Sequence, residues 1–399
     1  MKKIVLSLLA VSAILQSCSN NDDDNGNQVM SPATYEFTRA GNSTISFDGQ
    51  TTRIEMADAL VSALKDNTKT ETELNAMFAH AQGDADFDDA NLNASDKNVR
   101  SKVAASTDYF SANTTVSNEI KADFEGWIAS QVTDVFPNWN MVATAGNAGN
   151  LQQAGAGSVR YINGKGLELN QAFAKGLIGA LMIDQMLNNY LSPAVLDAGT
   201  NVADNDNDIV ETGKDYTSME HKWDEAYGYL YGSEPNPAVP VLDQDQFLGE
   251  YLDRVGGDSD FSTLAADIYN AFKKGRAAIV AKNYAVRDQQ AEIIKENISK
   301  IPAVRGVFYL QASKANLGTD NARAFHALSE AYGFIYSLQF TRKPNSTEPY
   351  VTKTEVDGYL AQLMAGNGFW DITNTTIDSV SDAIAAKFGF TTAQAASAD

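Results

Sequence analysis

The chain has 399 residues, 44% of them apolar, so it can bury a substantial core as two domains or as one large duplicated domain. Its formal net charge of −21 gives a surface that repels phosphate backbones, which argues against nucleic-acid binding. The single cysteine excludes an internal disulfide.

The N-terminus has the pattern of an export signal. Lys2 and Lys3 form a short basic segment, residues 4–15 are apolar, and LQSC ends the pattern at Cys18. This pattern resembles the lipobox of bacterial lipoproteins, and the resemblance implies cleavage before Cys18 and its acylation. An ordinary secretory peptide with an incidental cysteine is the alternative. No stretch reaches the roughly 20 apolar residues of a transmembrane helix, so we expect a lipid anchor on Cys18 as the link to the membrane.

Residues 18–33 are predicted to form a flexible tether, because SNNDDDNGNQ after Cys18 is polar and acidic. The segment is similar to the acidic signal that directs many Bacteroidota lipoproteins to the outer face of the outer membrane, and a plain linker is the alternative. We therefore expect a lipid-anchored outer-membrane protein exposed at the cell surface, with a periplasm-facing orientation as the alternative.

A small β-hairpin is predicted within residues 34–50, where polar residues alternate with aromatic or β-branched ones. Gly41-Asn42 and Asp48-Gly49 are its turn signals. A helix should follow, with Thr51 or Thr52 as its N-cap. Its apolar residues share one side: Ile54, Met56, Leu60, Val61 and Leu64.

Most of the remaining chain has helical periodicity. Helices are predicted near residues 71–80, 95–106, 117–135, 166–191, 216–231, 243–254, 261–282, 285–314, 319–340, 352–364 and 375–387. Strand signals are nearly absent after residue 50, so the predicted fold class is all-α.

An internal duplication organises the chain. NQAFAKG at 170–176 recurs as YNAFKKG at 269–275, and EHKWDEAYGYLYG from Glu220 recurs as FHALSEAYGFIYSL from Phe325. The two matches follow in the same order at similar separations, which is hard to produce by chance. We expect two pseudo-symmetric helical bundles.

The domain boundaries follow from this pattern. A boundary is expected in the Pro-rich segment 232–243, and the acidic connector 191–216 is expected to be a loop. The predicted units are a signal peptide (1–17), a tether (18–33), a first bundle with the hairpin (34–235) and a second bundle (240–395).

The repeated phrase places an imidazole beside a carboxylate. His221 with Glu225, and His326 with Glu330, are four residues apart and share a helix face. Asp224 lies on nearly the same stripe. Each pair is either a buried hydrogen-bonded lock between helices or a site for a ligand or a divalent metal ion. Small residues beside each pair permit close helix approach.

Lys175 and Lys274 occupy matching positions in apolar helices. If buried, they need carboxylate partners, for which Glu225 and Glu330 are the candidates. We therefore predict a Lys-Glu-His cluster in each bundle. Asp184, in the first long apolar helix, lies either on a solvent-facing stripe or in a polar interior.

The acidic run Asp204–Asp208 offers oxygens at EF-hand spacing, but Ile209 occupies the position that requires glycine. This mismatch argues against a true EF-hand and leaves looser Ca²⁺ binding open. His80 is predicted to be an ordinary residue at a helix end.

Three phrases suggest a family: YEFTRAGNSTISFDGQTTRIEM, NQAFAKGLIGALMIDQ and YTSMEHKWDEAYGYLYG. They resemble an uncharacterised Bacteroidota lipoprotein family, domain of unknown function 4856, over nearly the whole mature chain. More distantly, duplicated bundles with a His-bearing helix resemble the imelysin-like proteins, which are exported, linked to iron or haem uptake and in some cases classed as metallopeptidases. Their mark is Gly-x-His-x-x-Glu. The segment 219–224 lacks the glycine and has Asp for Glu, and 324–329 lacks both, which weakens the implied metal chemistry.

We expect a surface binding module that holds a small ligand, metal or metal complex in the groove between the bundles. An exported metal-dependent hydrolase and a structural or partner-binding surface protein are the alternatives, and a binding role is favoured over an enzyme. The candidate metal ligands are His221, Glu225, His326 and Glu330, and the candidate ligand-binding residues add Asp224, Lys175 and Lys274.

Overall fold

The computed structural model describes residues 29–397. The predicted signal peptide, the lipidation site at Cys18 and most of the predicted tether lie outside this range. Within it the fold is mostly helical with two short antiparallel hairpins, so the all-α prediction is confirmed. No helix between residues 29 and 397 combines the length and the apolar character needed to cross a membrane.

The N-terminal hairpin is present but smaller than predicted. Strand β1 (Thr38–Arg39) pairs with β2 (Asn42–Ser43), and the turn between them is Ala40-Gly41. Both turn residues have positive φ, 50° and 87°, as a two-residue turn of the primed type requires. The second expected turn, at Asp48-Gly49, begins helix α1 (Asp48–Ala63) instead, so the predicted N-cap threonines lie inside that helix.

The core is built around one long helical segment. Helix α5 (Leu169–Leu177) continues as two π-helical stretches, η4 (Ile178–Ile183) and η5 (Met186–Tyr190). Most of its residues are apolar and almost all are buried, which is typical of a helix surrounded by other helices. The predicted helix at 166–191 is confirmed.

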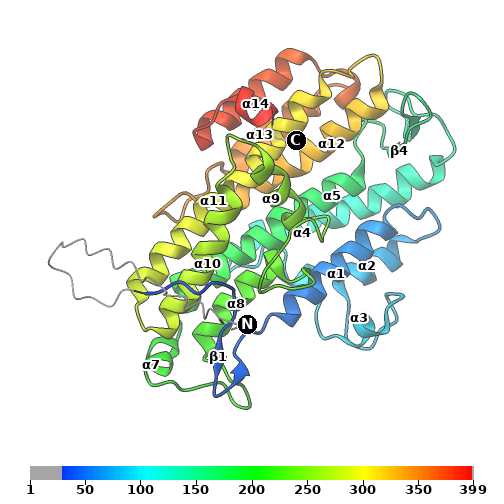
Figure 1. The fold of residues 1–399 in the computed structure, drawn as a ribbon. Helices are drawn as coiled ribbons and strands as arrows, with labels where there is room; N and C mark the ends of the chain where they lie inside the picture. Colours follow the sequence, from blue (N-terminus) through cyan, green and yellow to red (C-terminus); the bar gives the residue numbers. More distant parts are fainter. Residues whose placement is uncertain (1–28, 398–399) are drawn as a thin grey trace, which may run out of the picture.

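Three further helices pack against one another in succession. They are α10 (Leu264–Val280), α11 (Tyr284–Ser313) and α12 (Asn321–Ser337), and α12 also lies beside α5 (Figure 1). Gly333 permits this second contact, because a Cβ at this position would lie 2.5 Å from Cβ of Lys175.

Helix α8 (Ser218–Tyr231) carries the first copy of the repeated His phrase and packs against α1 and α10. A Cβ on Gly228 would lie 2.4 Å from Cβ of Phe47, and a Cβ on Gly275 would lie 2.1 Å from the Trp223 ring. The prediction that small residues of the repeated phrases allow close helix approach is therefore confirmed.

Each repeated Lys phrase packs against the His helix of the other copy. Helix α5 lies against α12, and α10 lies against α8. These contacts cross the predicted boundary at 232–243, which is a loop between α8 and α9 (Leu248–Gly257).

The other helices cover this core: α2 (Glu71–Ala79), α3 (Ala90–Ala94), α4 (Thr114–Ser130), α6 (Pro193–Leu196), α7 (Asn201–Asp206), α13 (Lys353–Leu363), α14 (Asn374–Phe388) and α15 (Thr392–Ala396). Short helical turns add η1 (Arg100–Lys102), η2 (Gln131–Val135), η3 (Phe136–Asn138), η6 (Leu338–Phe340) and η7 (Gly368–Trp370). Most predicted helices are confirmed, with ends shifted by a few residues.

The predicted helix at 95–106 is wrong, because only the turn η1 forms there. Ala104 has a φ of +46° and donates its N–H to the carbonyl of Ala180. The next two backbone N–H groups bond to Asp184. The central helix thus supplies acceptors for backbone N–H groups that would otherwise have bonded within a local helix.

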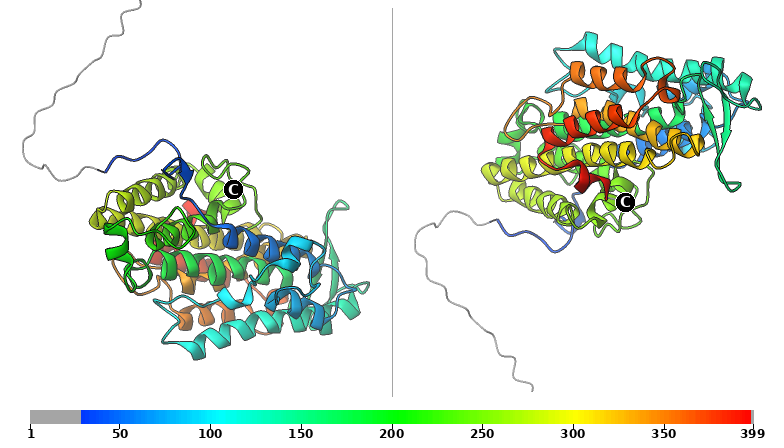
Figure 2. Two further views of the ribbon diagram at one scale, coloured as in Figure 1. Left: turned by 90° about the horizontal axis from the view of Figure 1, so that it is seen from below. Right: turned by 90° about the horizontal axis from the view of Figure 1, so that it is seen from above.

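Two other expectations need correction. The connector 191–216 contains the short helices α6 and α7 and is not purely a loop. A second hairpin, β3 (Gly149–Gln152) with β4 (Val159–Ile162), was not predicted. Figure 2 shows this hairpin projecting from the helical body. Tyr161 on β4 stacks on Trp139, with ring centroids 3.4 Å apart.

Candidate functional site

The second copy of the His phrase forms a filled polar cluster. His326 Nδ1 lies 2.9 Å from Glu168 Oε1, and its Nε2 lies 3.7 Å from Glu330 Oε2. Glu330 Oε1 lies 3.7 Å from Lys175 Nζ and accepts a hydrogen bond of 3.2 Å from the Tyr251 hydroxyl. A Lys-Glu-His cluster therefore exists here, but it joins the two predicted bundles, because Lys175 belongs to the first and Glu330 to the second. The prediction of one such cluster within each bundle is wrong.

Burial dominates the electrostatics of this cluster. The Lys175 and Glu330 side chains are only 6% and 9% exposed. Burial lowers the pKa of Lys175, and the negative charge of Glu330 opposes that shift. The charged groups of this cluster pair with one another, as expected of a buried polar cluster that holds α5 and α12 together.

The first copy has different surroundings. His221 Nδ1 lies 3.1 Å from the carbonyl oxygen of Ser46, so this nitrogen carries the proton and donates it. The ring stacks on Tyr216 with centroids 4.6 Å apart. Burial lowers the pKa of His221, although Glu225 partly offsets the shift. The imidazole is therefore neutral near pH 7, and Nε2 is the nitrogen left for a ligand.

Glu225 is not paired with Lys274, so the second predicted Lys-Glu-His cluster is wrong. Lys222, on the same helix, lies 2.6 Å from Glu225 Oε2, and Gln50 donates to Oε1 at 3.1 Å. Burial raises the pKa of Glu225, but Lys222 and His221 outweigh it and leave the pKa lowered. Lys274 is half-buried on α10.

Asp224 belongs to a buried ion-pair network. Arg276 Nε lies 3.0 Å from Asp224 Oδ1, and Arg276 Nη1 lies 3.0 Å from Glu220 Oε1. The Tyr35 hydroxyl also donates to Asp224 Oδ1, at 2.6 Å. Burial raises the pKa of Asp224 to about 6 against the opposing charge of Arg276. None of the Asp224 side chain is exposed, so in this structure it ties the N-terminal segment to α8 and α10.

Asp184 lies in the interior and not on a solvent-facing stripe, which decides between the two positions that the sequence left open. It accepts hydrogen bonds from the backbone N–H groups of Ala105 and Ser106, from the Ser106 hydroxyl and from the Asn188 amide. Burial raises the pKa of Asp184 to about 6, although these hydrogen bonds oppose the shift.

His221 and Glu225 line a pocket of about 410 Å³. Its walls come from the segment before α1, the first turn of α1, the region around η1, the end of η5 and the start of α8. Four cations line it, namely Arg53, Lys97, Lys102 and Lys214. Sequence reasoning missed all four because they come from separate segments with no shared spacing.

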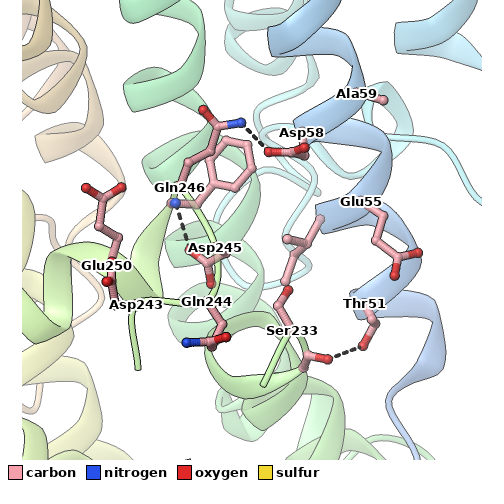
Figure 3. A pocket seen from close by; sticks show the side chains of 13 residues that line it. Thr51, Glu55, Asp58, Ala59, Ser233, Asp243, Gln244, Asp245, Gln246 and Glu250 are labelled. Atoms are coloured by element: carbon pink, nitrogen blue, oxygen red, sulfur yellow. Dashed lines mark hydrogen bonds between the residues drawn. The ribbon is translucent and has the colours of Figure 1, made fainter. Parts of the chain in front are cut away.

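A larger pocket of about 780 Å³ lies between α1 and the segment 232–250 (Figure 3). Asp58 projects from α1 toward the Asp243–Gln246 loop, and Gln246 donates to Asp58. Burial raises the pKa of Asp245 to about 6 despite backbone hydrogen bonds that lower it. This pocket was not predicted, and it contains none of the predicted site residues.

No group of three or more His, Cys, Asp and Glu side chains within residues 29–397 is arranged to hold a metal ion. The acidic run that suggested an EF-hand starts inside α7. Its residues bond elsewhere, since Asp208 pairs with Lys282 and Asp206 accepts from the Tyr284 hydroxyl. His80 ends α2, as predicted, and bonds to Asp86.

Comparison with known families gives one match. A family described as domain of unknown function (DUF4856) matches residues 32–391. No curated protein and no solved structure is similar to the chain.

Proposed function

The chain belongs to the DUF4856 family, whose description names no reaction, and we propose that it is a binding module with its ligand site in the His221 pocket. The site is defined by His221, Glu225 and the four cations around them. The His221 pocket therefore takes the place of the groove between two bundles as the candidate ligand site.

One observation carries this proposal: the two histidines of the repeated phrase differ in what their nitrogens contact. Both nitrogens of His326 face carboxylates, at 2.9 and 3.7 Å. Among the residues that the structure describes, His221 hydrogen-bonds to the protein only through Nδ1, and it lies in the wall of a pocket. A polar group fixed by one hydrogen bond and open on its other side is typical of ligand sites. The first copy therefore suits binding, and the second suits stability.

A screen by thermal denaturation tests the proposal. A library of small molecules and divalent metal salts is measured against the wild type and against His221→Gln and His326→Gln. A ligand of the pocket should raise the Tm of the wild type and of His326→Gln, because binding stabilises the folded state. It should not raise the Tm of His221→Gln. A ligand that stabilises His221→Gln as much as the wild type would bind elsewhere and contradict the proposal.

The hydrolase alternative has less support. Of the four candidate metal ligands only His221 and Glu225 line the pocket, whereas a catalytic zinc site usually has three protein ligands. His326 and Glu330 lie in the filled cluster with Lys175. If a divalent salt stabilised the wild type in the same screen, the metal-binding form of the proposal would be favoured.

We also propose that the chain is a lipoprotein anchored through Cys18 and exposed on the outer membrane, which LQSC and the acidic segment after it support. The expected result is incorporation of labelled fatty acid by the wild type and none by Cys18→Ala. Protease treatment of intact cells should degrade the protein if it faces outward. Protection from the protease would favour the periplasm-facing alternative.

Descent of the two units from one duplicated segment, and kinship with imelysin-like and Bacteroidota proteins, are proposals of the same kind. The repeated phrases support the duplication, as do the glycines at matching positions of α8 and α12, each in close contact with a neighbouring segment.

A further inference from the structure

We infer that the His221 pocket selects a small oxyanion, a carboxylate, sulfate or phosphate group, and that Lys102 is its main anchor. This inference rests on the proposed function and adds the chemical class of the ligand. It is carried by the charges that line the pocket and by the partners those charges have.

The pocket has a charge opposite to that of the whole chain. The chain has 51 acidic and 30 basic residues. The pocket is lined by four cations, and its acidic residues are only Asp48 and Glu225. A concave site with such a concentration of cations attracts anions from solution.

The partners of these groups leave positive charge uncompensated. Glu225 in the wall is already neutralised, since Lys222 pairs with it. Arg53 is buried, and its hydrogen bonds go to the backbone carbonyls of Asn98 and Gly49, which remove no charge. Of the four cations, Lys97 alone has an acidic partner in the described part of the chain, namely Asp96 at 2.7 Å.

Lys102 is the cation most in need of a counter-ion. Within residues 29–397 no carboxylate lies within ion-pair distance of its Nζ, which lies 5.9 Å from the centre of the Tyr190 ring. Burial lowers the pKa of Lys102, and the charges of Arg53, Lys222 and Lys97 lower it further, whereas the charge of Glu225 opposes the shift. A bound oxyanion would relieve this repulsion through a charge-assisted hydrogen bond.

The neighbouring groups suit an oxyanion that carries hydroxyl groups. His221 Nε2 can accept a hydrogen bond while Nδ1 donates to Ser46. The volume of about 410 Å³ lies within the range of small-molecule sites.

Titration calorimetry on the purified protein tests the inference. The probes are sodium sulfate, sodium phosphate and glucuronate, with glucose and glucosamine as neutral and cationic counterparts of glucuronate. At least one oxyanion should bind the wild type, and glucose and glucosamine should bind more weakly or not at all. Affinity should fall as salt is raised from about 20 to about 200 mM, because screening weakens charge attraction.

Two pocket variants and one control make the test specific. Lys102→Gln should weaken oxyanion binding by about tenfold or more, the loss expected for one charge-assisted hydrogen bond. Lys214→Gln, at an exposed position, should weaken binding less and tests the pocket if Lys102→Gln unfolds. Lys65→Gln removes the same charge from an exposed position outside the pocket and should leave binding unchanged.

The outcomes separate this inference from the proposed function. Absence of oxyanion binding by the wild type, or equal binding by all three variants, overturns the inference. If glucose or glucosamine binds in a manner that His221→Gln abolishes while the oxyanions do not bind, the proposed function stands and the inference fails. If no compound in the screen depends on His221, the proposed function fails as well.

Discussion

Glu225 and Glu330 occupy the same position in the repeated phrase but have different partners. Glu330 is the only acidic group within ion-pair distance of the buried Lys175 among the residues that the structure describes, whereas Glu225 pairs with the partly exposed Lys222. Glu330→Gln should therefore destabilise the fold by about 2 kcal/mol, because it leaves a buried ammonium without an anion. The long distance of 3.7 Å keeps this loss below that of a close pair.

Glu225→Gln is the matched control. Its cation is 31% exposed and can be solvated when the carboxylate is removed, so the loss should stay below about 1 kcal/mol. Urea unfolding of both variants measures the difference. Equal losses would contradict the assignment of the second copy as a structural lock.

Asp184 should make stability depend on pH. Its pKa is raised from 3.8 to about 6 by burial, so the folded state binds the proton more tightly than the unfolded state. The stabilisation is fully present below about pH 3.8 and is lost as pH rises through about 6. The effect is up to about 3 kcal/mol.

The measurement compares Asp184→Asn with the wild type, because the amide does not titrate. Urea unfolding at about pH 4 and about pH 7 gives the free energy of unfolding of each protein. The wild type should gain stability relative to the variant as pH falls between these values. A constant difference between the two proteins would show that Asp184 keeps the same protonation state on unfolding.

At this scale the sequence predicted contacts within a helix better than contacts between helices. The four-residue spacing placed Glu330 near His326, and the structure has them 3.7 Å apart. The partner of Glu225 was missed although Lys222 lies only three residues before it on the same helix. The partners of Lys175 and Lys274 could not be predicted from spacing, because they depend on which helix packs against each lysine. The pocket cations were harder to predict, because they come from three separate segments of the chain.

Among the elements, long segments with helical periodicity were predicted well, and segments stabilised by distant hydrogen bonds were not. The 166–191 helix is mostly apolar and matches α5 to η5. The segment 95–106 has helical spacing too, but at its end the Asp184 carboxylate accepts the backbone N–H groups of Ala105 and Ser106. Tertiary hydrogen bonds of this kind override a weak local preference.

The close contact between α8 and α10 depends on Gly275. A Cβ there would lie 2.1 Å from the Trp223 ring, and this ring is buried and held by a hydrogen bond to the Phe272 carbonyl. Gly275→Ala should therefore destabilise the fold by about 3 kcal/mol, because the helices must separate.

Gly126→Ala on α4 is the control, since a Cβ there would meet nothing within 4 Å. It should be neutral or stabilising by up to about 1 kcal/mol, as alanine favours helix over glycine. Thermal unfolding of both variants checks the pair. Similar Tm values for the two variants would mean that the α8–α10 contact adapts to the extra methyl group.

Across the whole molecule, the crossed packing ties the two halves of the chain together. Helix α12 buries its Gly333 face against α5 from the first half, and α10 contacts Trp223 on α8. The buried Arg276 on α10 also bonds to Glu220 and Asp224 on α8. Dividing the chain in the loop 232–243 would therefore separate helices whose apolar faces and ion pairs are buried against one another.

The fragment 240–397 should consequently fail to fold on its own. Without α8 its Arg276 loses both carboxylates, and without α5 the Gly333 face of α12 becomes exposed apolar surface. Such losses exceed the marginal stability of a domain, roughly 5–15 kcal/mol. The full chain should unfold in one calorimetric transition whose enthalpy equals the van't Hoff value. A fragment with native helix content and its own sharp transition would instead establish two bundles that fold independently.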